Sequence, residues 1–194
     1  MAIPVAKHHL SRQEYLRLEA SATDKHEFHA GEVLAMSGGT YEHSRILTNI
    51  IAALASRLKG GPCFPLESNM RVCIAREDRY VYPDALVVCG EPQFDPDDEN
   101  RTTIVNPRLV VEVLSDSTEA YDRGAKFTAY RTLTSMEEYV LVSQREPLVE
   151  SFRRQSDGFW IFAPIRGIDA VAAFTSIGVE VPLSEIYHGL PMGS

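Results

Sequence analysis

The sequence has no apolar run of the roughly 20 residues that a helix needs to cross a bilayer. Its first residues also lack the charged start, apolar middle and small-residue cleavage site of a secretion signal. We therefore expect a cytoplasmic protein with no membrane segment. A G-x-S-x-G elbow is absent, and no cysteine stands in a context that would pair it with a histidine. These two absences argue against a serine or cysteine hydrolase.

Cysteine and positive charge are both scarce. The three cysteines, Cys63, Cys73 and Cys89, are an odd number in apolar or strand-like surroundings. We expect reduced, buried thiols rather than a disulfide framework or a zinc site. Lysine and arginine total 19 against 27 aspartates and glutamates, which gives a net charge of −8. That balance argues against a protein that coats nucleic acid through a basic face, but it leaves room for an enzyme whose acids hold a metal.

Ordinary apolar (44%) and charged (24%) fractions predict one globular domain over residues 1–194. Helical periodicity is clearest over about 40–59, and shorter helices are expected near 11–19, after the capping box of Ser11 and Glu14, and near 119–133. Strand patterns, with a hairpin turn at Ala30-Gly31, occur at 27–29, 32–36, 67–74, 80–89, 138–143, 148–153, 159–165 and 179–181. The pattern indicates an α/β fold with a mixed β-sheet flanked by helices.

An acidic stretch within the connection 90–106 begins like a calcium-binding loop at Asp95. Its sixth position is Asn100 rather than glycine and its twelfth is Asn106 rather than glutamate, so the calcium hypothesis fails. We expect a solvated loop here instead.

The most informative stretch is 109–115, in which valine dominates and neither alternate set of positions is polar. Such a run predicts a strand that is buried on both faces. Glu112 lies in its middle, and a buried carboxylate is costly unless a partner, a proton or a metal offsets the loss of water. The partner would be a metal ion or a nearby arginine, Arg108 or Arg123.

Asp84 is a second costly acid, because it follows Pro83 at the start of an apolar run and aspartate is a poor strand former. Lys126 lies on the helix expected after Glu112, where Phe127 and Tyr130 recur at helical spacing. The two acids and the lysine are therefore the candidates for a reactive site.

Pro83-Asp84, then Glu112 on a buried strand, then Lys126 on the next helix resemble the motif of the PD-(D/E)xK nuclease superfamily. Within it, the chain resembles the Uma-two family of restriction-endonuclease-like bacterial proteins over roughly residues 10–155. Matching segments are also found at 26–33, His43, 112–115 and 122–127 with Tyr130. One position departs: Leu114 stands where the superfamily usually has lysine, two positions after the glutamate. The resemblance implies that Lys126 serves from the following helix.

The resemblance implies a restriction-endonuclease-like core and metal-dependent hydrolysis of phosphodiester bonds in nucleic acid, DNA before RNA. Mg²⁺, with Mn²⁺ as a substitute, would be held by Asp84, Glu112 and the backbone carbonyl of Val113. Lys126 would orient or polarise the attacking water and stabilise negative charge. A homodimer is expected because enzymes that cut a duplex often need two sites.

Glu27 and His43 complete the candidate site. Glu27 would be a second metal ligand or would hold a water, with a surface position in the hairpin as the alternative. His43 would line the site, with a solvated position in the first helical turn as the alternative. For Lys126 the alternative is an i,i+4 ion pair with Asp122 on the helix surface. Candidates for phosphate contacts, or else solvated charges, are Arg123, Arg131, Arg153 and Arg154.

Two other function classes stay open at the level of sequence. A catalytically silent module with the nuclease fold would bind nucleic acid or protein without needing a metal. A metal-dependent hydrolase of another phosphorylated substrate would use the same acids. Metal titration separates the first class from an enzyme, and a panel of substrates separates the second.

Overall fold

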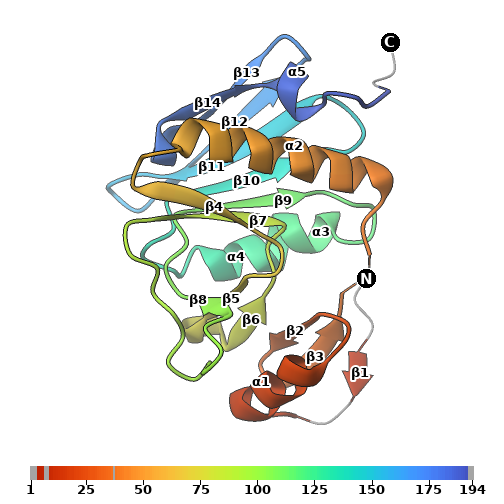
Figure 1. The fold of residues 1–194 in the computed structure, drawn as a ribbon, viewed down its shortest axis with the longest axis vertical. Helices are drawn as coiled ribbons and strands as arrows, with labels where there is room; N and C mark the ends of the chain where they lie inside the picture. The colour runs from red at the N-terminus through yellow and green to blue at the C-terminus, as the bar shows by residue number, and fades with distance from the viewer. Residues whose placement is uncertain (1–3, 7–8, 37, 192–194) are drawn as a thin grey trace.

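Valine-rich runs without a polar side form three neighbouring strands of a central, six-stranded sheet. The computed structural model describes residues 4–6, 9–36 and 38–191, and Figure 1 shows this sheet across their middle. Only β9 and β10 run parallel, so the sheet is mixed, as predicted. In spatial order its strands are β12 (Trp160–Arg166), β11 (Leu148–Arg154), β10 (Glu138–Val142), β9 (Leu109–Val113), β7 (Ala85–Cys89) and β4 (Cys63–Glu67).

Helices and a hairpin cover both faces of the central sheet (Figure 1). They are α2 (Tyr41–Leu58), α3 (Glu119–Tyr121), a π-helical turn (Asp122–Lys126), α4 (Phe127–Tyr130), β13 (Val171–Phe174), β14 (Val179–Pro182) and α5 (Leu183–Ile186). Side chains alternate along a strand, so Val111 packs in the core under α2, α5 and the hairpin, while Val110 packs toward α4. None of the helices in the described ranges is long and apolar enough to span a bilayer.

A second six-stranded sheet lies beside the first. Its order is β1 (Pro4–Ala6), β3 (Glu32–Ala35), β2 (His26–His29), β6 (Arg79–Val81), β5 (Arg71–Ile74) and β8 (Thr103–Ile104). β2 and β3 form the predicted hairpin, and its turn residues Ala30 and Gly31 have φ values of 48° and 99°. Two successive positive φ values match the tight hairpin turn that follows the right-handed twist of the strands.

Helix α1 (Arg12–Ser21) begins at the predicted capping box. The Ser11 backbone N–H donates to Glu14 Oε2 at 2.7 Å, and the Glu14 N–H donates back to Ser11 Oγ at 3.3 Å. Tyr15 then buries its ring against Phe28 of the second sheet, with centroids 5.2 Å apart. This contact holds the start of the chain on the hairpin that carries Glu27.

The predicted strand 80–89 is in fact two strands in two different sheets. β6 ends at Val81 and β7 begins at Ala85, and Tyr82, Pro83 and Asp84 carry the chain from one sheet to the other. Proline has no N–H to donate to a ladder, so Pro83 suits this break. Asp84 therefore stands directly before β7, where the two sheets meet.

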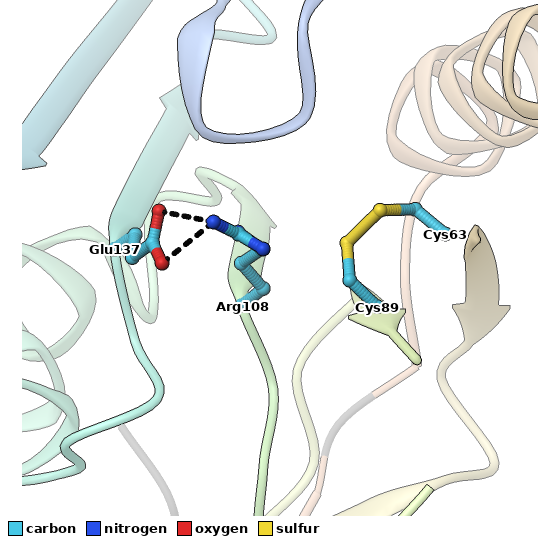
Figure 2. The surroundings of a disulfide bond; sticks show 4 residues. All are labelled: Cys63, Cys89, Arg108 and Glu137. Carbon is cyan, nitrogen blue, oxygen red and sulfur yellow. Dashed lines mark hydrogen bonds and ion pairs between the residues drawn. A yellow bond between two sulfur atoms is a disulfide. The ribbon is translucent and has the colours of Figure 1, made fainter. Parts of the chain in front are cut away.

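The prediction of three reduced cysteines is wrong for two of them. Cys63 and Cys89 form a disulfide that joins the edge strand β4 to β7, as Figure 2 shows. The strand register places the two cysteines directly opposite each other, with Cα atoms 4.0 Å apart. They form a non-hydrogen-bonded pair of the antiparallel ladder, in which opposite side chains approach closely. Their separation of 26 residues gave no sign of this register. Cys73 is free, and burial raises the pKa of its thiol to about 12.

The prediction of a solvated acidic loop at 90–106 is also wrong at two positions. Asp95 and Asp98 are buried, at 6% and 5% exposure. Tyr80 donates its hydroxyl to Asp95 at 2.5 Å, and Asp98 pairs with the buried Arg71 at 3.2 Å. The loop therefore packs against the second sheet because two of its acids satisfy buried donors there.

Candidate functional site

Asp84 and Glu112 come together on one face of the central sheet. Register pairs Ala85 of β7 with Val111 of β9, so Asp84, directly before β7, lies beside Glu112 of the neighbouring strand. Their even-numbered neighbours Leu86 and Val110 both pack toward α4, which places the acids on that same face. The Asp84 N–H donates to Glu112 Oε2 at 3.4 Å, and the Val113 N–H donates to Asp84 Oδ2 at 2.7 Å.

Lys126 reaches this pair of acids from the π-helical turn. Its Nζ lies 2.8 Å from Glu112 Oε1, and it also donates to the carbonyl of Tyr82 at 3.3 Å. Its side chain is 6% exposed. π-Helical turns are uncommon and are frequent at functional sites. The predicted helix 119–133 is therefore present, but it contains this turn and its last helical residue is Tyr130.

Asp122 belongs to the same cluster, so its i,i+4 pair with Lys126, the alternative considered from sequence, is present but buried rather than on the helix surface. Asp122 Oδ1 is 3.5 Å from Lys126 Nζ, but both side chains are buried, at 4% and 6% exposure. The sequence indicated Asp122 only as the possible i,i+4 partner of the lysine. Its spacing from Lys126 was correct, but the direction in which the pair faces depends on the π-helical turn.

Glu27 enters from β2 of the second sheet and is buried, not at the surface. Its Oε1 lies 3.6 Å from Lys126 Nζ and accepts the Tyr82 N–H at 3.2 Å. Its Oε2 accepts the Tyr121 hydroxyl at 3.1 Å and lies 3.1 Å from His29 Nε2. Sequence reasoning gave no role to His29 or Tyr121, because the hairpin that carries His29 meets the end of α3 only in the folded structure.

His43 lines the site and is not a solvated residue of the first helical turn. Its Nε2 lies 3.0 Å from Asp84 Oδ2, and its side chain is 16% exposed. Thr40, the N-cap of α2, accepts the His43 N–H at 3.2 Å and so fixes this turn against the sheet.

The two arginines considered as partners of Glu112 are occupied elsewhere. Arg108 pairs with Glu137 at 2.8 Å. Arg123 pairs with Glu119 at 2.9 Å and Glu150 at 2.5 Å. Lys126 is consequently the cation that faces Glu112.

Charge in the cluster is unbalanced, because four carboxylates surround one lysine. Burial and the neighbouring acids raise the pKa of Glu112 well above its usual value, although Lys126 acts the other way. Burial works against the charged ammonium, yet Glu112, Glu27 and Asp122 outweigh it and raise the pKa of Lys126 well above its usual value. Burial also works against the charge on Glu27, but Lys126 and His29 outweigh it and lower that pKa. The cluster therefore has room for more positive charge.

Asp84 and Glu112 are the residues that could hold a divalent cation here, because Mg²⁺ takes one or two carboxylates together with water and substrate oxygens. Within the described ranges no three His, Cys, Asp or Glu side chains stand together as a ready metal cage.

The cluster opens into a cleft of about 1360 Å³ between the hairpin, the start of α2 and the loop after β9. Its lining includes Glu27, His29, His43, Asp84, Glu112 and Lys126. A drug-sized ligand needs roughly 300–1,000 Å³, so this cleft has room for an extended substrate.

Comparisons with known proteins identify a family and a fold. Residues 12–183 match the sequence model of the Uma2 family, described as "Putative restriction endonuclease". Two proteins of Synechocystis sp., named uncharacterized proteins slr1290 and sll1609, are 36% and 34% identical to the chain. The matches cover 93% and 86% of this chain, and 93% of each relative.

A crystal structure from Anabaena variabilis, described as "a putative nuclease belonging to DUF820", has the same fold. It superposes with a TM-score of 0.74 at 15% identity, over 92% of this chain and 97% of that one. The predicted restriction-endonuclease-like core is therefore confirmed. The match to the family model runs from α1 to the start of α5, and the fold agrees with it. This chain therefore belongs to the Uma2 family of restriction-endonuclease-like proteins.

Proposed function

We propose that this protein is a Mg²⁺-dependent nuclease that hydrolyses phosphodiester bonds of DNA. The observation that carries the proposal is the position of Lys126, buried 2.8 Å from Glu112 and beside Glu27 and Asp122, at the base of a wide cleft. Burying these charged groups costs free energy, and an ion pair that served stability alone could form at the surface without that cost. The family match supports a nuclease-like function on independent grounds.

In this proposal Asp84, Glu112 and the Val113 carbonyl hold the ion, which would supply a polarised water and charge stabilisation at phosphorus. His43 and the Val113 N–H hold the Asp84 carboxylate in place, since both contact Oδ2. The raised pKa of Lys126 keeps its ammonium protonated at neutral pH. Lys126 therefore acts as a fixed positive donor toward the attacking water and the developing phosphate charge, not as a base.

Glu27 has a distinct place, because the hydrogen bonds of Tyr121 and Tyr82 fix both of its oxygens. We propose that Glu27 positions Lys126 and binds a water molecule in the site. The proposal extends to Mn²⁺ as a substitute ion, a homodimer as the form that cuts a duplex, and a cytoplasmic location.

The test is a cleavage assay with single- and double-stranded DNA and RNA, in Mg²⁺, Mn²⁺ or EDTA. Wild type should cut in either metal and not in EDTA. Asp84→Asn and Glu112→Gln keep shape but remove charge, and both should lose cleavage. If the wild type binds nucleic acid but never cuts it in either metal, the catalytically silent module is favoured. If the two variants cut normally, Asp84 and Glu112 do not form the active site.

A further inference from the structure

The edge of the central sheet beside α4 carries a surface of arginines and aromatic rings. We call it the aromatic–arginine patch: Arg131, Phe152, Arg154, Trp160 and Phe162. The Arg154 guanidinium lies 5.0 Å from the centroid of the Trp160 ring, and Arg154 also donates to the carbonyl of Arg131. The rings of Phe152 and Phe162 contact each other at a tilt of 38°, with centroids 4.9 Å apart. Phe162 is 49% exposed, so a ring face remains open to a partner.

The charge of the patch is opposite to that of the whole molecule. The chain has a net charge of −8, yet neither Arg131 nor Arg154 forms an ion pair with any acid in the described part of the chain. Glu137, the acid whose charge acts on Arg154 in the folded structure, forms an ion pair with Arg108, as Figure 2 shows. Two guanidiniums are thus free to meet an anionic partner.

The patch continues from the candidate site. Arg123, which lines the cleft, is followed at steps of four by Phe127 and Arg131 along the helical segment, a span of roughly 12 Å at 1.5 Å per residue. Phe127 lies beneath the patch, 5.3 Å from Trp160 and 5.2 Å from the Arg131 guanidinium. On the neighbouring strand Phe152 and Arg154 follow Glu150, the partner of Arg123, on the same face. The helical segment and β11 therefore lead from the cleft to the patch. Glu119 and Glu150 neutralise Arg123 on the way, so positive charge without an acidic partner begins at the patch itself.

We propose that the aromatic–arginine patch binds a single-stranded stretch of nucleic acid that extends out of the cleft. Stacking on open rings and contacts from arginine to phosphate are the means by which proteins hold single strands without reading their sequence. This inference rests on the proposed function, because it takes the substrate to be nucleic acid. It adds a binding surface that the catalytic cluster does not contain.

Trp160 is the only tryptophan of the chain, so its fluorescence reports on the patch directly. The probe is a single-stranded oligothymidylate of twelve nucleotides, titrated in EDTA at several salt concentrations so that no cleavage occurs. Wild type should show saturable quenching. Phe162→Ala should weaken binding ~5-fold or more, the loss expected for one stacked base.

Arg131→Gln and Arg154→Gln should each reduce the slope of log affinity against log salt by ~0.7, since each removes one phosphate contact. The matched control is Arg166→Gln, an exposed arginine of β12 that pairs with Glu146 at 3.1 Å and lies outside the patch. It should bind like wild type. Urea midpoints of all variants show whether each has folded.

Absence of quenching, or an equal loss in Arg166→Gln, would overturn the inference. So would patch variants that change the sedimentation coefficient without changing oligonucleotide affinity, because the patch would then be a protein interface.

A substrate of only a few nucleotides separates the two proposals: patch variants should cut it at the wild-type rate. If wild type cuts nothing but Trp160 is quenched, the nuclease proposal fails and the patch stands. If it cuts but shows no quenching, the patch alone fails.

Discussion

Glu27 and Glu112 bring the same carboxyl group into the same cluster, yet the fold treats their charges in opposite ways. The pKa of Glu27 is lowered, so its charge stabilises the fold above the unfolded pKa of about 4.3, and this is lost as pH falls. The pKa of Glu112 is raised, so its charge destabilises the fold as pH rises above the same value.

We therefore expect substitutions of equal shape to have opposite effects on the free energy of unfolding at pH 7–8. Glu27→Gln should lower it by about 2 kcal/mol, the cost of losing hydrogen bonds to a charged group. Glu112→Gln should raise it. Urea unfolding at pH 8 and pH 4 checks this, because both differences should shrink at pH 4. A loss of stability in both variants at pH 8 would contradict the assignment.

Lys126 should matter to chemistry more than to metal binding. Lys126→Met removes the ammonium and keeps the stem, so we expect Mn²⁺ binding by calorimetry to persist while single-turnover cleavage falls ~10²-fold or more. Lys59→Met, at the exposed C-cap of α2, is the matched control and should be neutral. Because Asp122 is buried 3.5 Å from the ammonium, we expect Asp122→Asn to reduce cleavage as well. Equal, small losses in Lys126→Met and Lys59→Met would leave the site without its cation.

How far the sequence predicts the site depends on where each residue lies. Glu112 and Asp84 were identifiable because a carboxylate in an apolar run is costly wherever the strand pairs. Their convergence, and the reach of Lys126, depended on a family resemblance that the match now confirms. His29 and Tyr121 left no local signal, since they meet only when a hairpin and a helix from distant parts of the chain pack together.

At the scale of elements, the π-helical turn positions Lys126 and contains one glycine. Gly124 does not have a positive φ, and a Cβ added there would meet nothing within 4 Å. Glycine in a helix costs about 0.5–1 kcal/mol relative to alanine. Gly124→Ala should therefore raise stability by about that amount in urea and leave cleavage unchanged. A folded Gly124→Ala that no longer cuts would instead indicate close approach of substrate to this backbone.

Elements with strong internal periodicity were predictable, whereas pairing between elements was not. α2 and the hairpin followed from local spacing and turn chemistry. The split of 80–89 into β6 and β7 did not, because an apolar run looks alike whether it stays in one sheet or crosses to another. The register that sets Cys63 against Cys89 is likewise a long-range property of the folded sheet.

At the scale of the whole molecule, the disulfide ties the edge strand β4 to its neighbour β7. A cross-link between cysteines at a sequence separation of 26 contributes ~3.5 kcal/mol in the chain-entropy treatment. The double variant Cys63→Ser, Cys89→Ser should lose that stability in urea, and wild type should lose it on addition of dithiothreitol. Cys73→Ala keeps the bond and should retain the response to reductant. A wild type that is indifferent to reductant would restore the original expectation of free thiols.

The two large sheets share the candidate site, so we expect them to unfold together. Glu27 comes from the second sheet, Glu112 from the first, and Lys126 contacts both. Trp160 lies on β12, the edge strand of the first sheet at the other end from β4, so its fluorescence reports the unfolding of this sheet. If residues 1–194 form the single domain expected from sequence, Glu27→Gln should shift the urea midpoint of Trp160 fluorescence as far as that of far-ultraviolet circular dichroism, which reports both sheets. A Trp160 midpoint that stays at the wild-type value while the dichroism midpoint moves would show that the second sheet unfolds on its own, and that the cleft opens without loss of the central sheet.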